Sequence, residues 1–599
     1  MLLLLPPSLT LASPAGSDSA RIAGVVVTTD ATPQPVRRAI VTVSGGPLAL
    51  SLNAITDDEG RFAIADVPAG RFTISASRAS YVTIAYGASA PGRAGVPLVV
   101  EAGQRVTGIR LLLARGAAIA GTVRDTDGEP VPGVVVRLAR RNGAARVTLP
   151  RTVETDDRGG YRLFGLAAGE YFVVAETPYQ TGVSGPLQAA SSEEIDRALQ
   201  ALARGSTNPA EPKQPLPAAA SERTVAMTPV WYPSASSSED ATPISLQTGE
   251  ERSGADITMR LLPVAAIEGA VSPLAGRDWP ADVRVNLYPA TAGVVTPALI
   301  ESPSRDNGGR FRFGSVTPGT YFVVAETLSA GIASQMAKDA PARSAAPRGD
   351  YLWATETVVT SGTDVTGVSL VLAPGLRMHG RIEIETTAGQ RRPDVSTARV
   401  GIIATRPGRG DAANARLAMD VRFPITVGPD GAFDLANLPP ATYSFTCTLP
   451  SSAPGVARGW WLRSATIDGR DILDEPYTLD PSAPVPTVVL TLTDRHSSLS
   501  GTFQDAAGRA TSAITVLVFP ANPAWRGESS RRVRVQRPGT DGTYSFIDLP
   551  PGEYILAAAT DMEPDAWKDP AFLRSLIAGG VRVTIGEGEQ KTQDLRIGR

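Results

Sequence analysis

The sequence predicts an all-β protein built from five tandem antiparallel β-sandwich modules with two short helical insertions. Three observations lead to this prediction. Five segments of the 599-residue chain share one spacing of glycine and aromatic residues, and short stretches in which every second residue is apolar recur along its length. Glycine (58) and proline (50) are frequent enough to supply many tight turns between strands. A single hydrophobic core is excluded, because cores stop growing at roughly 250–300 residues.

The repeated signature is glycine, any residue and an aromatic residue, followed ten positions later by a second aromatic residue. The five aromatic pairs are Phe62/Phe72, Tyr161/Tyr171, Phe311/Tyr321, Phe433/Tyr443 and Tyr544/Tyr554. An Asp- or Asn-containing turn precedes each first aromatic, and a Leu/Val-x-x-Gly turn, with Ala441 replacing glycine in the fourth copy, precedes each second one. Apolar residues alternate after both aromatics, so we interpret each signature as a β-hairpin.

Each signature lies between an opening strand with a central glycine and an alternating closing strand. The opening strands contain Gly24, Gly121, Gly269, Gly380 and Gly501. The first four closing strands run within a few residues into the next opening strand, which leaves little linker and predicts a semi-rigid rod. The predicted modules are residues 20–115, 116–263, 264–375, 376–495 and 496–599, of which the fourth is the most divergent.

Two insertions carry helical patterns. Residues 191–202 begin with a capping box and space their apolar residues at helical intervals, and they run into a Pro/Ala-rich loop at 208–220. Residues 569–576 begin with an aspartate followed by proline, as an N-capped helix does. We expect these helices to close one end of a sandwich; the alternative is that they form a binding edge.

The first 19 residues form an apolar, signal-peptide-like segment with small residues at Ala12 and Ala15. The segment lacks a basic region, so either its start is truncated or it is only a short apolar tail. We favour export, which places the protein outside the cell, in the periplasm or in the cell envelope. No later run reaches the roughly 18 apolar residues of a membrane helix, and the net charge of −3 offers no attraction to nucleic acid.

Residues suited to catalysis are scarce. The single cysteine, Cys447, falls on the apolar face of an alternating strand and is interpreted as a core residue. The two histidines, His379 and His496, are too few and too far apart in sequence for a zinc site, and no nucleophile elbow or phosphate-binding loop is present. Acidic turns such as 125–128 are interpreted as solvated, because they lack the ligand series of a calcium loop. The sequence therefore predicts no catalytic residue, no metal and no cofactor.

A longer motif carries a family resemblance. Residues 121–136 read Gly-Thr-Val-x-Asp-x-x-Gly-x-Pro-Val-Pro-Gly-Val-Val-Val, and residues 155–171 read Thr-Asp-Asp-x-Gly-x-Tyr-x-Leu-x-x-Leu-x-x-Gly-x-Tyr. This pattern resembles carboxypeptidase regulatory-like domains, which are transthyretin-like (prealbumin-like) sandwiches with an Ig-like appearance, found in tandem in secreted bacterial proteins. The resemblance is clearest in modules 1, 2 and 5. It implies an accessory domain, because in carboxypeptidases the catalytic zinc belongs to the neighbouring hydrolase.

The function predicted from these features is a non-catalytic structural spacer or interaction scaffold with an unknown protein or polysaccharide ligand. One alternative is a carbohydrate-binding protein that assists polysaccharide capture, with Trp231, Tyr232, Trp460 and Trp461 as candidate contacts, because they lie outside the repeated strands. A second alternative is an accessory part of an outer-membrane TonB-dependent receptor system, to which single modules of this family are often fused. A lysine–asparagine crosslink is excluded, since no opening strand contains lysine.

Overall fold

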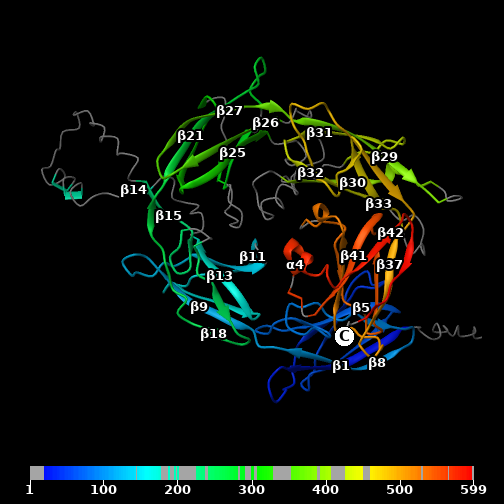
Figure 1. The fold of residues 1–599 in the computed structure, drawn as a ribbon. Coiled ribbons are helices and arrows are strands. Elements are labelled where there is room, and N and C mark those ends of the chain that lie inside the picture. Colours follow the sequence, from blue (N-terminus) through cyan, green and yellow to red (C-terminus); the bar gives the residue numbers. More distant parts are fainter. Residues whose placement is uncertain are drawn as a thin grey trace, which may run out of the picture.

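In the computed structural model of the protein, β-strands dominate and are arranged around a closed curve (Figure 1). The structure describes residues 19–142, 145–176, 187–188, 195–196, 199–200, 224–236, 240–280, 283–289, 299–301, 307–327, 352–387, 392–405, 425–449, 459–527, 530–560, 562–563 and 565–596. The signal-peptide-like segment up to residue 18 and the loop at 208–220 lie outside these residues. Within the described residues, no helix is long and apolar enough to cross a membrane.

Ten of the eleven sheets in the described part of the chain form five successive pairs, each closing over its own cluster of buried apolar side chains. We use the word module for each pair. This architecture confirms the predicted all-β sandwich class, while the module boundaries stay a prediction.

Modules 1 and 2 share one plan. Module 1 has one sheet of β4 (Arg61–Val67), β1 (Ala20–Thr28) and β8 (Arg105–Leu113), and a second of β3 (Leu52–Ile55), β2 (Ile40–Ser44), β5 (Gly70–Ser77), β6 (Ile84–Ala85) and β7 (Leu98–Val100). Module 2 has one sheet of β12 (Gly160–Leu166), β9 (Ala117–Arg124), β18 (Glu251–Arg252) and β19 (Ile257–Thr258), and a second of β11 (Ala145–Glu154), β10 (Val135–Asn142), β13 (Gly169–Glu176), β16 (Val230–Trp231) and β17 (Ile244–Leu246). The eleventh sheet, between modules 2 and 3, is β14 (Leu187–Gln188), β15 (Thr224–Met227) and β20 (Leu261–Pro263).

Modules 3 to 5 repeat the plan with different edges. Module 3 has β24 (Arg310–Val316), β21 (Ala265–Ser272) and β27 (Val365–Val371), facing β23 (Leu299–Glu301), β22 (Val283–Pro289), β25 (Gly319–Thr327), β26 (Leu352–Thr360) and β28 (Ala373–Pro374). Module 4 has β31 (Ala432–Leu438), β29 (Leu376–Glu385), β36 (Thr487–Thr493), β33 (Trp461–Ile467) and β34 (Arg470–Asp471), facing β30 (Arg399–Thr405), β32 (Thr442–Thr448) and β35 (Tyr477–Thr478). Module 5 has β40 (Thr543–Ile547), β37 (Ser498–Gln504), β43 (Gln590–Thr592) and β44 (Leu595–Arg596), facing β39 (Arg534–Gln536), β38 (Thr515–Pro520), β41 (Gly552–Ala559) and β42 (Val581–Ile585).

The signature does not form the hairpin that the sequence predicts. Its two strands lie in opposite sheets: in module 1, β4 pairs with β1, whereas β5 pairs with β2. The turn between them is an arch, and both aromatic side chains point from facing sheets into the same core. Alternation of apolar residues specifies the buried face of a strand but not its partner, which is why the sequence suggested a hairpin.

A hydroxyl group fixes this arch in four modules. The second aromatic is tyrosine there, and its hydroxyl donates to the backbone carbonyl four residues earlier, within the turn. The oxygen–oxygen distance is 2.8 Å from Tyr171 to Ala167 and 2.7 Å from Tyr443 to Pro439. Because a buried hydroxyl needs a partner, this bond ties the turn length to the aromatic position and accounts for the constant spacing.

The opening and closing strands of each module run parallel to each other, in contrast to the otherwise antiparallel pairing. In modules 1, 2, 3 and 5 they approach closely at the central glycine of the opening strand, whereas in module 4 the ring of Phe433 lies against Gly380. A Cβ atom on Gly24 or Gly501 would overlap with the carbonyl oxygen of Ile109 or Gln593 on the closing strand. The glycine therefore permits a close backbone approach, which is the physical reason for its place in the repeat.

The helix predicted at 569–576 is present as α4 (Pro570–Ser575), with Asp569 as its N-cap and Pro570 in the first turn. It covers the outer face of the β38–β41 sheet, where Leu573 packs with Phe519 and Ile555. The sequence predicted that this helix closes one end of the sandwich, but it lies on the outer face of a sheet instead. Of the helix predicted at 191–202, the structure describes residues 195–196 and 199–200, and these are helical; the other residues of that segment lie outside the described part. Short 3₁₀ turns are η3 (Val395–Thr397), η4 (Pro523–Trp525) and η5 (Ala566–Lys568).

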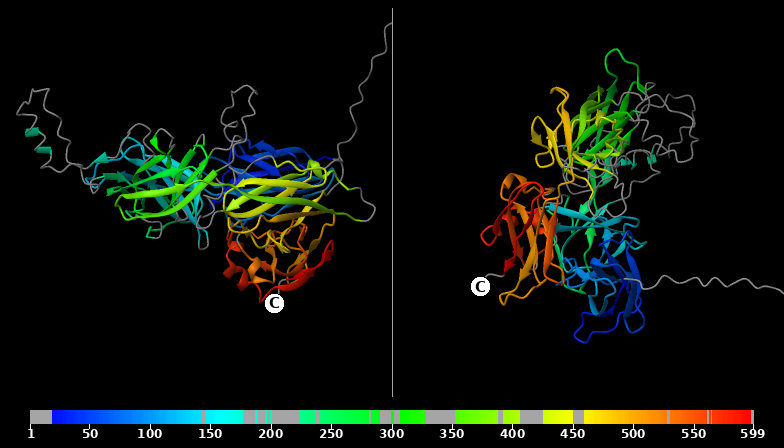
Figure 2. Two further views of the ribbon diagram at one scale, coloured as in Figure 1. Left: turned by 90° about the horizontal axis from the view of Figure 1, so that it is seen from above. Right: turned by 90° about the vertical axis from the view of Figure 1, so that its right-hand side faces the viewer.

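The predicted rod is wrong. The modules follow one another around a curve, so that the first and the fifth meet (Figure 1). Modules 1 to 4 lie in one layer, and module 5 lies on one side of it (Figure 2). Short junctions do limit flexibility, but each one also turns the chain, and the turns accumulate until the ends touch.

Candidate functional site

Trp231 is not a surface aromatic, contrary to the sequence prediction. Its side chain is 2% exposed and packs with Phe172 and Val174 on the outer face of the β10–β13 sheet. That face would otherwise expose apolar side chains to water, so the indole acts as its cover. Its ring faces are not accessible to a sugar. The neighbouring Tyr232 is half-buried and packs against the core of module 2.

Trp460 and Trp461 lie together where module 4 meets module 5. Trp460 is half-buried against the module 4 core. The Nε1 of Trp461 donates to the backbone carbonyl of Arg495 at 3.0 Å, on the segment that joins the two modules. The structure thus places this pair at a module junction, and their role as glycan contacts stays a prediction.

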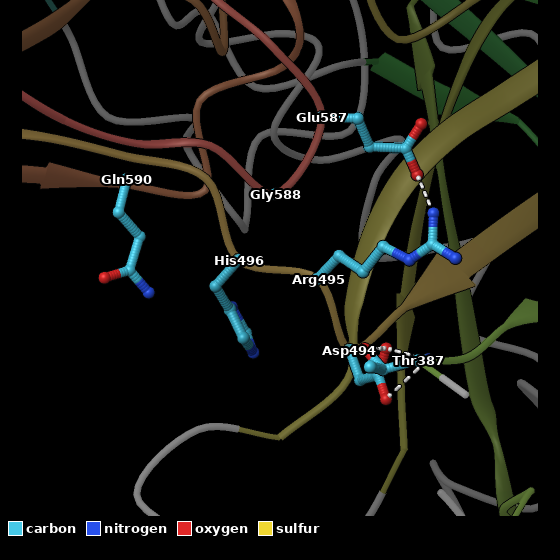
Figure 3. A pocket seen from close by; sticks show the side chains of 7 residues that line it. All are labelled: Thr387, Asp494, Arg495, His496, Glu587, Gly588 and Gln590. Carbon is cyan, nitrogen blue, oxygen red and sulfur yellow. Dashed lines mark hydrogen bonds and ion pairs between the residues drawn. The ribbon is translucent and has the colours of Figure 1, made fainter. Parts of the chain in front are cut away.

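A polar cavity of about 400 Å³ lies at the same junction (Figure 3). It is lined by Thr387, Asp494, Arg495, His496, Glu587, Gly588 and Gln590. The Asp494 carboxylate accepts hydrogen bonds from the backbone N–H of Thr387 at 2.9 Å and from its hydroxyl at 3.1 Å. The guanidinium of Arg495 pairs with Glu587 at 3.5 Å. Segments of both modules therefore contribute to one hydrophilic hollow.

His496 bridges the two modules beside this cavity. Its Nδ1 lies 2.6 Å from a carboxylate oxygen of Asp548 in module 5, and its Nε2 lies 2.8 Å from the carbonyl oxygen of Gly459 in module 4. The side chain is 13% exposed. With both ring nitrogens engaged, His496 is a structural bridge, and neither nitrogen faces the cavity as a free base.

The deepest contact between the modules is an ion-pair cluster. Asp474, which follows β34 of module 4, accepts from Arg531 at 2.9 Å and from Arg532 at 2.7 Å, both on the segment before β39 of module 5. The side chains of Asp474 and Arg532 are 4% and 8% exposed. Arg531 also contacts Asp471 at 2.6 Å.

The charges of this cluster hold each other in the ionised form. Burial opposes ionisation of Asp474, but the hydrogen bonds from Arg531 and Arg532 outweigh it, so its pKa is lowered from the usual value. Burial likewise opposes the charge on Arg532, yet its bonds to Asp474 and Tyr554 raise its pKa. Each charge therefore depends on a partner in the other module.

Arg532 connects this cluster to the core of module 5. Its Nη1 donates to the hydroxyl of Tyr554, the second aromatic of the fifth signature, at 3.1 Å. Its guanidinium lies 4.5 Å from the ring centre of Trp525, a distance suited to a cation–π contact. The Nε1 of Trp525 in turn lies 3.4 Å from a carboxylate oxygen of Glu475 in module 4.

Two further observations concern the single cysteine and possible metal ligands. Cys447 is buried, as predicted, and burial raises the pKa of its thiol to about 12, which keeps it protonated. Among the described residues no group of three or more histidine, cysteine or acidic residues is arranged for a metal ion. The junction offers hydrogen-bonding groups and charges, which are suited to binding and to holding modules together.

Comparison with known families gives two matches along the chain. Residues 21–107 and 118–200 each match the model of the carboxypeptidase regulatory-like domain. The chain carries tandem carboxypeptidase regulatory-like domains. The matched residues correspond to module 1 and to the first part of module 2, which confirms the resemblance carried by residues 121–136 and 155–171. No curated protein matches the chain.

The chain is also similar to solved structures of bacterial pilins. It is 11% identical to the Streptococcal ancillary pilin, over 59% of this chain and 99% of that one, with a TM-score of 0.20. It is 9% identical to BcpA, the major pilin subunit of Bacillus cereus, over 81% of this chain and 99% of that one, with a TM-score of 0.16. TM-scores this low transfer neither the arrangement nor the function of those proteins.

Sequence reasoning missed the ion-pair cluster. The run Arg531-Arg532 and the acidic residues between 471 and 475 are visible in the sequence, but each alone is typical of a solvated surface. Nothing in the sequence pairs them, because the two segments meet only after both modules have folded.

Proposed function

We propose that the protein is a non-catalytic scaffold, secreted or held in the cell envelope, whose β-sandwich modules keep their surfaces in a defined mutual arrangement. The observation that carries this proposal is the ion-pair cluster of Asp474, Arg531 and Arg532 between modules 4 and 5. A buried charge that loses its partner is costly, so this junction resists any rotation that separates the two modules. A scaffold needs such fixed angles, whereas independent binding domains on flexible linkers do not.

Further contacts at this junction support the proposal. Arg463 of module 4 pairs with Glu385 at 3.0 Å and with Glu587 of module 5 at 3.3 Å. His496 and Arg495, on the joining segment, also contact groups of module 5. The segment therefore has hydrogen bonds to both sides and acts as part of the interface.

The proposal is tested by distance distributions between spin labels at Ala483→Cys in module 4 and Ala506→Cys in module 5, both at exposed positions. The native Cys447 is buried and does not compete for label. We expect one narrow distribution, which broadens in Asp474→Asn and stays narrow in Asp468→Asn, an exposed aspartate of the same module. An equally broad distribution in the unsubstituted protein would rule out a fixed arrangement.

Carbohydrate binding is a second candidate, favoured by the position of the junction cavity. Its lining includes Gln590, which is exposed, and the Arg495–Glu587 pair, and the indole N–H of Trp461 is bound to the backbone carbonyl of Arg495. Amide, guanidinium and carboxylate groups can donate to and accept from the hydroxyl groups of a sugar. The export and envelope location that such a role requires is part of the same proposal.

Pull-down on insoluble polysaccharides tests this candidate. Retention that is lost in Gln590→Ala and in Trp461→Ala, but kept in Trp231→Phe, would support the cavity as the site. Trp231→Phe is the control because its ring is buried in module 2, far from the junction in sequence and structure. If the unsubstituted protein binds no polysaccharide, carbohydrate binding is ruled out and the scaffold function is the one that remains.

A further inference from the structure

Modules 1 and 5 contact each other although more than 400 residues separate the segments involved. Arg71, between the glycine and the second aromatic of the first signature, donates to Thr543 of module 5. Its Nη1 lies 2.6 Å from the threonine hydroxyl oxygen and its Nη2 lies 2.9 Å from the backbone carbonyl oxygen. One arginine therefore binds two neutral oxygens of Thr543, the first residue of β40.

The turn immediately before β40 occupies an edge of module 1. The backbone N–H of Thr540 donates to the carbonyl of Pro97 at 3.0 Å, and the Thr540 hydroxyl accepts from the backbone N–H of Val99 at 3.2 Å. On its other side, β7 pairs with β5. Thr540 thus satisfies two main-chain groups of an edge strand, as an added strand would.

Two more arginines complete the contact. The Nη1 of Arg537 donates to the carbonyls of Gly87 and Ala94, each at 2.7 Å. Arg93 of module 1 forms an ion pair with Glu563 of module 5, whose side chain is 65% exposed. All of these contacts are polar, and Thr540 itself remains exposed.

No apolar cluster is shared across this contact within the described residues. The buried cluster of module 1 contains residues from 20 to 113 only, and those of module 5 contain residues from 499 to 595 only. Polar contacts that are exposed or half-buried, as these are, each contribute little to stability, because water replaces them when they open. The contact therefore opens at a much lower free-energy cost than unfolding of either module.

We propose that the contact between modules 1 and 5 is a reversible clasp, which gives the chain a closed state and an open state with all modules folded. In the open state the Val99 N–H and the Pro97 carbonyl of the β7 edge return to water, and Arg71 and Arg537 are freed. This inference goes beyond the scaffold proposal and does not depend on the rigidity of the junction between modules 4 and 5, which is measured with a different label pair.

The test uses the full chain with fluorescent labels at Asp58→Cys in module 1 and Ala506→Cys in module 5, both exposed. Single-molecule energy transfer is expected to show a major closed and a minor open population. Arg71→Ala/Arg537→Ala removes four hydrogen bonds across the contact, together with the bond from Arg537 to the Ser512 carbonyl within module 5. We expect the open-to-closed ratio to rise about tenfold or more. Arg110→Ala/Arg582→Ala, on exposed arginines of the same two modules, is expected to leave the ratio unchanged.

A second experiment uses a disulfide to restore the closed state in the Arg71→Ala/Arg537→Ala protein. Val99→Cys/Thr540→Cys joins the two positions whose main chain and hydroxyl already lie 3.2 Å apart. In the Arg71→Ala/Arg537→Ala protein, oxidation is expected to return the closed population and reduction to remove it, at unchanged circular dichroism. Identical distributions in the unsubstituted, Arg71→Ala/Arg537→Ala and control proteins would overturn the clasp, and so would an unsubstituted protein that is entirely open.

Discussion

Module 5 makes two interfaces, and they differ in what they bury. Toward module 4 it places Arg532 on Asp474, two charges whose side chains are 8% and 4% exposed. Toward module 1 it offers Thr540 and Thr543 to exposed or half-buried polar groups. A buried ion pair cannot be broken without stranding a charge, whereas an exposed hydrogen bond is exchanged for water. We infer that the first interface fixes an angle and that the second only favours one.

The largest expected effect follows from stranding that charge. Asp474→Ala leaves Arg532 buried without its carboxylate, and we expect the free energy of unfolding of modules 4 and 5 to fall by about 3 kcal/mol. Chemical denaturation of the full chain, followed by tryptophan fluorescence, measures the loss. Asp468→Asn serves as the control. If Asp474→Ala is as stable as this control, the Asp474–Arg532 pair does not contribute to the free energy of unfolding.

A substitution inside module 5 tests the stability of its own fold, apart from its contacts with modules 1 and 4. In Gly501→Ala the new Cβ overlaps with the Gln593 carbonyl, so the parallel opening and closing strands move apart. We expect a loss of about 2 kcal/mol in the unfolding free energy of module 5. Gly579→Ala, where a Cβ meets nothing within 4 Å, is the matched control. Equal melting curves for the two variants would contradict the close approach.

Acid should weaken the interface between modules 4 and 5. The pKa of Asp474 in the folded protein lies below its usual value of 3.8, so its carboxylate stabilises the junction above that pH. This stabilisation is lost as the pH falls from 3.8 through the lowered pKa. Labels at Ala483→Cys and Ala506→Cys should report a broadening in that range which Asp474→Asn, already broad, does not show. A junction that stays narrow well below this range would contradict the assignment.

The smallest expected effect concerns the clasp. Thr540→Val removes the hydroxyl that accepts from Val99 but keeps the backbone bond to Pro97. We expect the open population to rise by about twofold to fivefold, with no measurable change in global unfolding. Thr540→Ser, which keeps the hydroxyl, should behave like the unsubstituted protein. A loss of global stability in Thr540→Val would show that the contact belongs to the fold of module 5.

The sequence predicted the sandwich class, the signature and the helix capped by Asp569, because each depends on local alternation, turn residues or caps. It did not predict which strands pair. The strands of the first signature, around Phe62 and Phe72, have the same apolar alternation whether they form a hairpin or an arch between two sheets. Partner choice is a long-range property that alternation does not contain.

The candidate site was harder to predict than the fold. Trp231 looked like a surface aromatic because it lies outside the repeated strands, yet a second apolar face of its sheet needed a cover. Asp474 and Arg532 were invisible as a pair, since they meet only through the angle between two folded modules. Junction angles also decide that the chain curves back on itself, and local sequence rules do not describe them.

One measurement most directly tests the difference between the fixed interface with module 4 and the reversible contact with module 1. It compares the distance distributions across both interfaces of module 5 in the same unsubstituted background. A label at Ala506→Cys is paired with Ala483→Cys for module 4 and with Asp58→Cys for module 1. We predict a single narrow distribution toward module 4 and two populations, closed and open, toward module 1. A broad distribution toward module 4 would contradict the fixed interface. A single rigid distance toward module 1 that Arg71→Ala/Arg537→Ala leaves unchanged would contradict the reversible contact.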